Sequence, residues 1–138
     1  MKRYMSLDIG DRTIGIAVSD LLGLTAQGVE TIRRKSLKDD LQRLGELMQA
    51  YETKSLVSGL PKNMDGTEGD RCAIAKEFMA EVKKAYPDVE VFFWDERLST
   101  VAATRSLIEA DVSRRKRKKV IDKMAAVFIL QGFLDSKR

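Results

Sequence analysis

Three acidic residues lie in apolar surroundings, where a carboxylate is costly to bury. Asp8 stands between a leucine and an isoleucine, Glu96 closely follows an apolar run, and Asp122 lies in a mostly apolar stretch near the end of the chain. Removing such a group from water is unfavourable unless a cation, backbone N–H groups or a metal ion compensates for it. One acid of this kind would carry little weight, but three of them together indicate a site.

Each of these acids also has a purely structural interpretation. Asp8 can cap the turn that follows its strand, and Glu96 can pair with Arg97 or with a helix N-terminus. Asp122 can be stabilised by a helix dipole and by Lys118 or Lys119. Taken one at a time these alternatives stay open, and the functional interpretation rests on the three acids together.

The chemistry open to these acids is narrowed by what the sequence does not contain. The chain has no histidine and one cysteine, which excludes a Ser-His-Asp triad, a Cys-His pair and a histidine-ligated zinc site. A bound metal would therefore be a hard, oxygen-ligated ion such as magnesium, manganese or calcium. Carboxylates can hold two divalent ions about 4 Å apart, which activate water and stabilise the leaving oxygen in phosphoryl transfer.

Cations are unevenly distributed along the chain, whose net charge is +4. Six consecutive cations precede Asp122, and they are Arg114, Arg115, Lys116, Arg117, Lys118 and Lys119. A second basic cluster consists of Arg33, Arg34, Lys35 and Lys38. Positive patches near buried acids indicate a polyanionic ligand held close to metal. Contact with nucleic acid is the favoured interpretation of the six-residue run, and a solvated loop or a nuclear-localisation signal is the alternative.

These residues need a scaffold that brings distant segments together. Apolar, β-rich runs predict five strands, over 3–9, 14–19, 27–32, 54–58 and 89–94. Helical spacing predicts helices over 37–52, 71–86, 100–110 and 119–135, with 111–118 as a polar, basic connector. The early turns predict antiparallel pairing, and the later strands, separated by helices, predict parallel crossovers. We therefore expect one α/β domain over 1–138, with a mixed five-stranded sheet flanked by helices.

The predicted strand ends are where open α/β sheets place their ligands. Asp8 ends the first strand and Glu96 follows the fifth, so both would project from one edge if these strands flank the fourth. The loop 60–70 is long for a connection between a strand and a helix. Its polar residues can hold a substrate backbone, although an ordinary connection is the simpler interpretation.

Composition also bears on location. No apolar run approaches the roughly 20 residues needed to cross a membrane. The N-terminus lacks the features of a signal peptide, and the lone Cys72 fits a reducing cytosol. We therefore expect a cytoplasmic protein without membrane partners, and the sequence leaves its oligomeric state open.

Four motifs in the chain resemble those of a known family. They are Leu7 to Gly10 with Ile14 to Asp20, Gly59 to Glu68, Asp95 to Thr100, and Val120 to Ala126 with Ile129 to Gln131. In this order they are similar to the YqgF/RuvX family of bacterial Holliday-junction-resolvase-like proteins, which are also described as pre-16S rRNA nucleases. The first motif alone would also fit a sugar kinase or an actin-like ATPase. An ATPase of that kind would bind ATP but would need a second lobe.

The resemblance implies an RNase H-like fold whose first three strands are antiparallel. It implies a nuclease site in which Asp8, Glu96 and Asp122 bind Mg²⁺ or Mn²⁺. The implied substrate is the 5′ end of precursor 16S rRNA, and branched DNA of the Holliday-junction type is the alternative. A non-catalytic RNA-binding factor in ribosome assembly is a further alternative. Because Asp95 directly precedes Glu96, the motif leaves open which of the two acids faces the metal.

We expect polar and cationic side chains around this site to hold the nucleic-acid strand. They are Arg12, Lys62, Asn63 and Arg97, together with Arg114, Arg115, Lys116, Arg117, Lys118 and Lys119.

Overall fold

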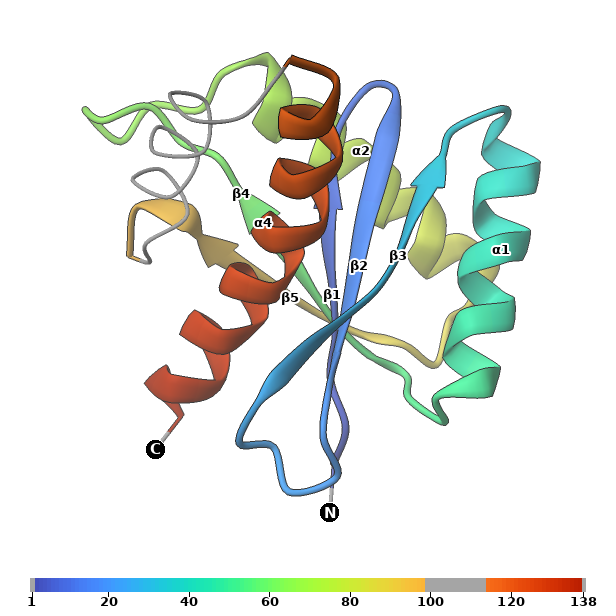
Figure 1. Ribbon diagram of the computed structural model, residues 1–138. Coiled ribbons are helices and arrows are strands. Elements are labelled where there is room, and N and C mark those ends of the chain that lie inside the picture. Colours follow the sequence, from blue (N-terminus) through green and yellow to red (C-terminus); the bar gives the residue numbers. More distant parts are fainter. Residues whose placement is uncertain (1, 99–113, 138) are drawn as a thin grey trace.

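The computed structural model describes residues 2–98 and 114–137, and within 114–123 it describes the backbone alone (Figure 1). Five strands form one mixed sheet in the order β3-β2-β1-β4-β5. Their bounds are Met5–Ile9 for β1, Thr13–Ser19 for β2, Ala26–Arg33 for β3, Ser55–Leu60 for β4 and Glu90–Asp95 for β5. The first three strands pair antiparallel, and β4 lies parallel to both β1 and β5. The predicted mixed five-stranded sheet is thus confirmed.

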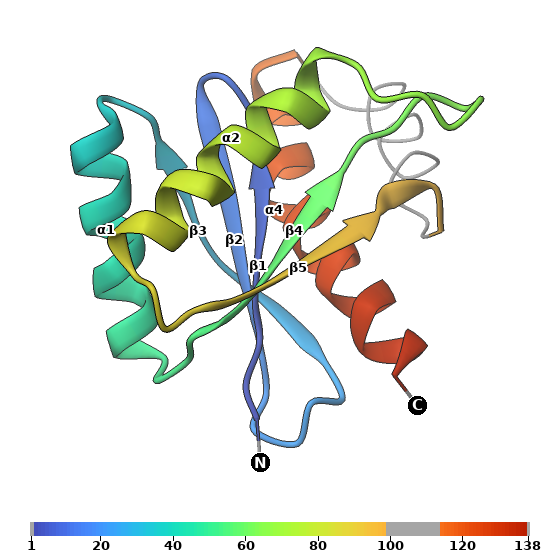
Figure 2. The ribbon, with the colours of Figure 1, turned by 180° about the vertical axis from the view of Figure 1, so that it is seen from behind.

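Helices cover both faces of this sheet. Helix α1 spans Leu37–Ala50, α2 spans Asp70–Ala85 and α4 spans Arg114–Ser136. The first two lie together on one face, and α4 crosses the other (Figures 1 and 2). Ser36 caps α1 by accepting a hydrogen bond from the Asp39 N–H, as expected of a serine at this position. The helices predicted over 37–52 and 71–86 are confirmed to within a residue or two.

The sheet has a hydrophobic core on each side because β1 and β4 are buried on both faces. Met5, Leu7 and Ile9 pack with residues of α1 and α2 in the larger cluster. The smaller cluster joins the opposite face to α4, and its buried members are Tyr4, Ala17, Val57, Ala125, Ala126, Ile129, Leu130, Phe133 and Leu134. Side chains of a strand alternate between faces, so residues of β1 next to Leu7 point toward α4.

Helix α4 corrects one expectation. It begins at Arg114, whereas we expected a connector over 111–118 and a helix from 119. Arginine and lysine are strong helix formers, so a run of cations can extend a helix whose later turns are anchored by apolar packing. The helix predicted over 100–110 lies outside the described residues. None of the helices within the described ranges is long and apolar enough to cross a membrane.

Candidate active site

Asp8 is buried near the carboxyl end of β1, on the face that α4 covers. It alternates with Leu7 and Ile9, and its side chain is 5% exposed. Two residues earlier, the hydroxyl of Ser6 donates a hydrogen bond to the Ala126 carbonyl of α4. Arg71, in the first turn of α2, lies with its Nη2 3.7 Å from Asp8 Oδ1. This cation partly offsets the cost of burying the Asp8 carboxylate.

Glu96 is the second buried acid, and it follows β5 directly as the first residue of the short 3-10 helix Glu96–Leu98. It is 5% exposed. Its carboxylate lies over Gly59 of β4, where an added Cβ would stand 2.7 Å from Glu96 Oε2 and 2.5 Å from Ile129 Cδ1. A side chain at this point of β4 would force Glu96 or Ile129 of α4 to shift, and both of these side chains are buried. The close approach also puts the Glu96 carboxylate on the α4 side of the sheet.

The register of the sheet brings these two acids to the same edge. Leu7 of β1 pairs with Ser58 of β4, and Gly59 pairs with Trp94 of β5. Because the three strands are parallel, Asp8 near the end of β1 and Glu96 just after β5 lie at the same end of the sheet, with only β4 between their strands. Adjacent strands are about 4.8 Å apart, so the backbones of β1 and β5 are roughly 10 Å apart. The condition that the sequence left open is met, since β1 and β5 flank β4.

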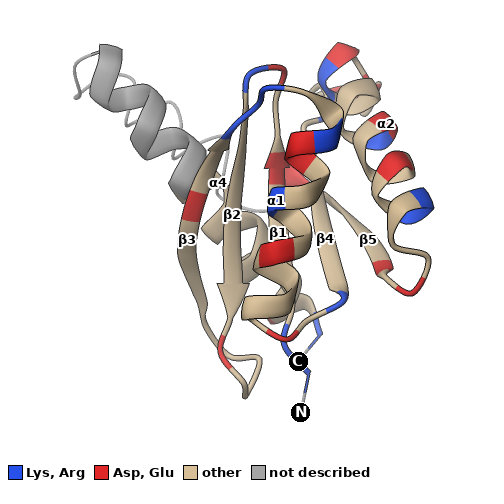
Figure 3. Ribbon diagram, turned by 90° about the vertical axis from the view of Figure 1, so that its right-hand side faces the viewer, with Lys and Arg blue, Asp and Glu red and all other residues tan. Residues whose placement is uncertain are grey.

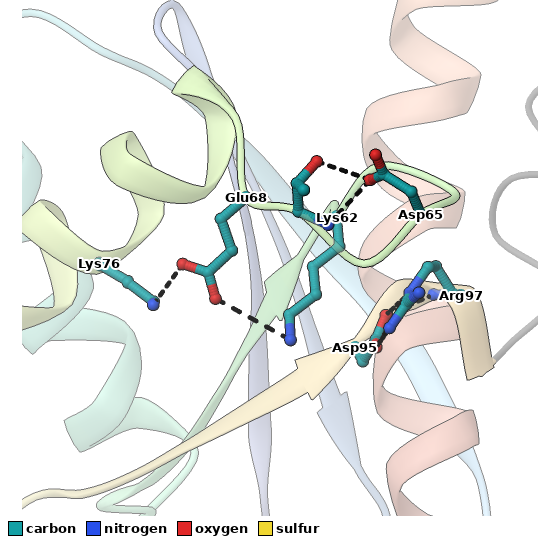
Figure 4. Close-up of polar contacts among 7 residues, drawn as sticks. Lys62, Asp65, Glu68, Lys76, Asp95 and Arg97 are labelled. Carbon is teal, nitrogen blue, oxygen red and sulfur yellow. Dashed lines mark hydrogen bonds and ion pairs between the residues drawn. The ribbon is translucent and has the colours of Figure 1, made fainter.

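Asp95 takes a different position from Glu96. Its carboxylate pairs with the guanidinium of Arg97, with Arg97 Nη2 2.7 Å from Asp95 Oδ2 (Figure 4). This hydrogen bond holds the pKa of Asp95 below its ordinary value. The carboxylate also accepts a hydrogen bond from the Arg97 backbone N–H. Of the two adjacent acids, Glu96 is therefore the one that lies beside Gly59 on the face of Asp8.

The third predicted acid, Asp122, belongs to α4, and its side chain lies outside the described part of the structure. Its backbone position follows from the contact between Ser6 and Ala126. Asp8 lies two strand residues, roughly 6.6 Å, beyond Ser6. Asp122 lies four helix residues, roughly 6 Å, before Ala126. Helix α4 runs opposite to β1 (Figure 1), so the backbone of Asp122 lies close to the level of Asp8.

Among the side chains that the structure describes, no three acidic or cysteine side chains gather closely enough to hold a metal ion. Asp8 and Glu96 supply two carboxylates at this edge, and a third carboxylate would have to come from outside the described side chains. The backbone of the six-cation run forms the first turns of α4, directly before Asp122. The side chains of Arg114, Arg115, Lys116, Arg117, Lys118 and Lys119 lie outside the described part.

The loop 61–69, which connects β4 to α2, is held by internal polar contacts (Figure 4). Asn63 Nδ2 donates to Thr67 Oγ1, and the Asn63 N–H donates to the Thr67 carbonyl. Asp65 accepts from the Thr67 hydroxyl, and Gly66 completes the turn at a φ of +89°. These contacts close a tight turn between Asn63 and Thr67.

Two predicted substrate-binding cations are tied to this loop. Lys62 Nζ lies 3.9 Å from Glu68, which also pairs with Lys76. Arg97, besides its pair with Asp95, donates to the Met64 carbonyl at 3.5 Å. The side chains of Lys62 and Arg97 are thus engaged within the protein. In contrast, Arg12 lies exposed in the turn between β1 and β2.

Sequence reasoning missed two residues of this site. Arg71 could have been recognised from its position in the sequence. It lies at the start of a helix that follows a loop after a strand, and from there its side chain can reach a carboxylate at a strand end. Gly59 could have been recognised only as a strand-terminal glycine. Its role depends on a close approach between residues that are 37 and 70 positions further along the chain, Glu96 and Ile129.

Comparison with known proteins places the chain in a family. The sequence profile of RuvX, described as a Holliday junction resolvase, matches residues 2–136. The chain belongs to the RuvX family. A relative from Clostridioides difficile strain 630 is 59% identical over 135 residues, covering 98% of this chain and 95% of the relative. One from Clostridium botulinum strain Hall is 57% identical, covering 97% of each chain. Both carry the name "Putative pre-16S rRNA nuclease".

Solved structures share the RuvX fold at low sequence identity. RuvC of Thermus thermophilus, solved in complex with a Holliday junction substrate, has a TM-score of 0.60 at 11% identity, covering 99% of this chain and 96% of that one. The Holliday junction resolvase of fowlpox virus has a TM-score of 0.54 at 13% identity, covering 99% of each chain. At such identities the likeness establishes the fold alone, which is RNase H-like as predicted.

Proposed function

We propose that this RuvX-family protein is a divalent-metal-dependent endonuclease that acts at the 5′ end of precursor 16S rRNA. The observation that carries the proposal is the pair of buried carboxylates, Asp8 and Glu96, at the ends of strands on either side of β4. Helix α4 brings the backbone of Asp122 close to the same level. We propose Asp8, Glu96 and Asp122 as the metal ligands and catalytic residues.

The residues fit Mg²⁺ or Mn²⁺. Carboxylate oxygens are the ligands these hard ions prefer, and the chain has no histidine to favour a softer metal. Gly59 keeps the space beside Glu96 Oε2 clear of a Cβ atom. When bound, such ions lower the pKa of water and stabilise the negative charge of a phosphoryl transition state.

The chain's own residues hold the reacting groups. Asp8 and Glu96 supply negative charge at the ends of β1 and β5, on either side of β4, where burial gives their side chains little freedom to move. Arg71 balances Asp8 at 3.7 Å and presents a half-exposed guanidinium to a phosphate approaching this edge. The closed turn of the loop 61–69 lies on one side of the path by which substrate reaches the acids. Lys62, Asn63 and Arg97 would contact the substrate there by giving up their partners within the protein and binding phosphate instead.

Ribosomal RNA is our first choice of substrate because the relatives that are 57–59% identical carry a pre-16S rRNA nuclease name. Branched DNA is the second candidate, favoured by the description of the family as a Holliday junction resolvase. Maturation of rRNA implies work in the cytoplasm, which agrees with the single cysteine of the chain.

The deciding experiment supplies purified protein with Mn²⁺ and measures cleavage of precursor 16S rRNA segments and of four-way DNA junctions. We expect Asp8→Asn to reduce cleavage by more than about a hundredfold with substrate binding retained, because metal-dependent stabilisation of the transition state amounts to several kcal/mol. Asp88→Asn is the matched control, since Asp88 is an exposed acid at the opposite end of the sheet.

Two results would contradict the proposal. If Asp8→Asn cuts at the wild-type rate, these residues are not the site. If the wild-type protein binds precursor rRNA without cutting either substrate, the non-catalytic assembly factor is the correct function.

A further inference from the structure

Four exposed cations gather at one corner of the molecule, at the same end of the sheet as Asp8. Arg12 lies in the turn between β1 and β2, Arg33 ends β3, and Lys35 and Lys38 lie at the start of α1. Figure 3 shows blue segments close together at the upper ends of β2 and β3 and at the start of α1. We call Arg12, Arg33, Lys35 and Lys38 the basic ridge.

The backbone joins the members of this ridge directly. Thr13, next to Arg12, pairs with Arg33 across β2 and β3. The N–H of Arg34 donates to the Arg12 carbonyl at 2.8 Å, which ties the turn to the connection that leads into α1. The side chain of Arg34 then donates to the Gly10 carbonyl at 2.8 Å. The ridge is therefore fixed relative to Asp8, which lies two residues before Gly10.

The ridge differs from other described cations in its lack of internal partners. None of its four side chains forms an ion pair with a described residue. At the opposite end of the sheet, Lys2, Lys54 and Lys84 each pair with an acid, namely Glu90, Asp88 and Glu81.

Nearby acids offset the charge of the ridge only in part. Asp40 is committed to Arg34 by a buried ion pair, with Arg34 Nε 3.1 Å from Asp40 Oδ2. Asp11 and Asp39 are exposed neighbours in the chain, and the exposed Glu77 of α2 lines the same pocket as Lys35 and Asp11, so three carboxylates without a described ion pair lie near the four ridge cations. A net positive surface on a well-anchored backbone suits a polyanion with regularly spaced charges.

We propose that the basic ridge binds the sugar-phosphate backbone of the nucleic acid on the side of the active site away from the loop 61–69. The inference rests on the proposed nuclease function, since it assigns a path for the same substrate. Arg33 lies on the third strand of the sheet, two strands from β1 and thus roughly 10 Å to the side of Asp8. The phosphates of one nucleic-acid strand are spaced only a few ångströms apart. A nucleic-acid strand that contacts both Asp8 and the ridge must therefore extend beyond the active site by more than one nucleotide.

The ridge, more than Lys62 and Arg97, is expected to determine the salt dependence of binding. Lys62 and Arg97 must give up ion pairs with Glu68 and Asp95 to bind phosphate, whereas ridge cations release only counterions. Each phosphate contact that is lost lowers the slope of log affinity against log salt by about 0.7 to 0.9.

The test compares two triple variants of equal charge change. The ridge variant is Arg33→Gln/Lys35→Gln/Lys38→Gln. The control is Lys2→Gln/Lys54→Gln/Lys84→Gln at the opposite end of the sheet. Binding is measured over a salt series in EDTA, with a precursor rRNA segment in one arm and a four-way DNA junction in the other. Thermal unfolding of both variants checks that they fold.

We expect the ridge variant to bind at least about tenfold more weakly at low salt, with a salt slope smaller by about 2. The control should keep the wild-type slope and affinity to within about twofold. A loss in the RNA arm alone, or in the DNA arm alone, identifies which backbone the ridge binds.

Two outcomes would overturn the ridge proposal. A folded ridge variant that keeps the wild-type salt slope in both arms removes the ridge from the interface, even where the wild-type protein cleaves RNA. Equal losses in the ridge and control variants would mean that net charge alone is responsible. Binding by the wild-type protein with a ridge-dependent slope but no cleavage on adding Mn²⁺ would instead support the ridge and contradict the nuclease function.

Discussion

Gly59 is the residue on which the geometry of the candidate site depends most directly. It lies in β4 between Asp8 and Glu96, and its missing side chain gives the Glu96 carboxylate its place. A methyl group at this position would overlap Glu96 Oε2 and Ile129 Cδ1, and both side chains are held in buried surroundings. Adding a single methyl group at Gly59 would therefore displace the side chain of Glu96, which is 37 residues away in the sequence.

We predict that Gly59→Ala destabilises the protein by about 1–3 kcal/mol, the usual cost of overpacking a core. Because the substitution displaces Glu96, cleavage should fall further than the loss of folded protein explains. The control is Gly45→Ala in α1, where an added Cβ would also overpack, against the Tyr86 hydroxyl, but beside Lys54 and Asp88 at the opposite end of the sheet. Urea unfolding and the cleavage rate measure the two effects. Equal activity of both folded variants would rule out a role for the close approach.

For individual acids, burial could be predicted from the sequence, but the choice between the adjacent Asp95 and Glu96 could not. Asp8 and Glu96 stood out because acids within or beside apolar runs are unusual, and both are buried as their surroundings implied. The choice between Asp95 and Glu96 had no local signal. It follows from the pairing of Asp95 with Arg97 and from the contact of Glu96 with Gly59.

Among the elements, one buried ion pair joins four segments near the site. Arg34 follows β3, Asp40 lies in the first turn of α1, and their side chains meet at 3.1 Å. Arg34 also donates to Gly10 in the turn after β1, and its guanidinium lies 5.1 Å from the ring centre of Phe78 in α2. Asp40 accepts a further hydrogen bond from the Lys35 N–H. The pair therefore holds the turn after Asp8 against both helices of one face.

Removing one member of this pair should cost much more than removing both. We predict that Asp40→Ala destabilises the protein by about 2–4 kcal/mol, because it leaves the mostly buried Arg34 without its carboxylate. The double variant Arg34→Met/Asp40→Leu should recover part of that loss, since it leaves no uncompensated charge. Denaturant unfolding measures both free energies.

An exposed ion pair provides the comparison for this prediction. Asp88→Ala removes an acid that is paired with Lys54 at the surface, and such pairs contribute about 0–1 kcal/mol. If Asp40→Ala costs no more than Asp88→Ala, the buried pair does not stabilise the junction.

Helices and strands were predicted correctly where the apolar residues had a clear periodicity. The prediction was wrong at the start of α4, where the sequence is a run of charged residues. The strands and the helices over 37–52 and 71–86 follow from apolar spacing that each segment carries by itself. The start of α4 at Arg114 was missed because a run of cations has no apolar stripe, and a polar run is typical of a connector. Its helical state depends on continuation from turns that pack on the sheet.

At the scale of the whole molecule, hydrogen bonds lower the pKa of six carboxyl groups among the described residues, namely Asp20, Glu30, Asp65, Glu68, Glu90 and Asp95. Arg43 is the main cause at Glu30, and Arg97 is the main cause at Asp95. In the unfolded chain these acids return to their ordinary values and bind protons at a higher pH than in the folded protein. The free energy of unfolding must then fall as the pH falls through this window.

We predict that the protein is progressively less stable as the pH decreases from about 5 to about 3, which spans the ordinary pKa values of 4.5 for Glu and 3.8 for Asp. Urea unfolding at several pH values measures this loss. Glu30→Gln removes one of the contributing carboxyls and should lose less stability over the same range than the wild-type protein. A free energy of unfolding that stays constant or rises toward pH 3 would contradict the assignment.

The sequence by itself determined the types of residue available for chemistry and the segments that carry them. Acids in apolar surroundings, the absence of histidine and the apolar periodicities are local properties, and they led to a hard-metal site on a mixed sheet. Only the tertiary structure decided that β1 and β5 flank β4, that Gly59 makes room for Glu96, and which cations lack internal partners. Each of these depends on contacts between residues far apart in the chain. Strand order and ion pairing arise from packing the whole molecule, and no local pattern records them.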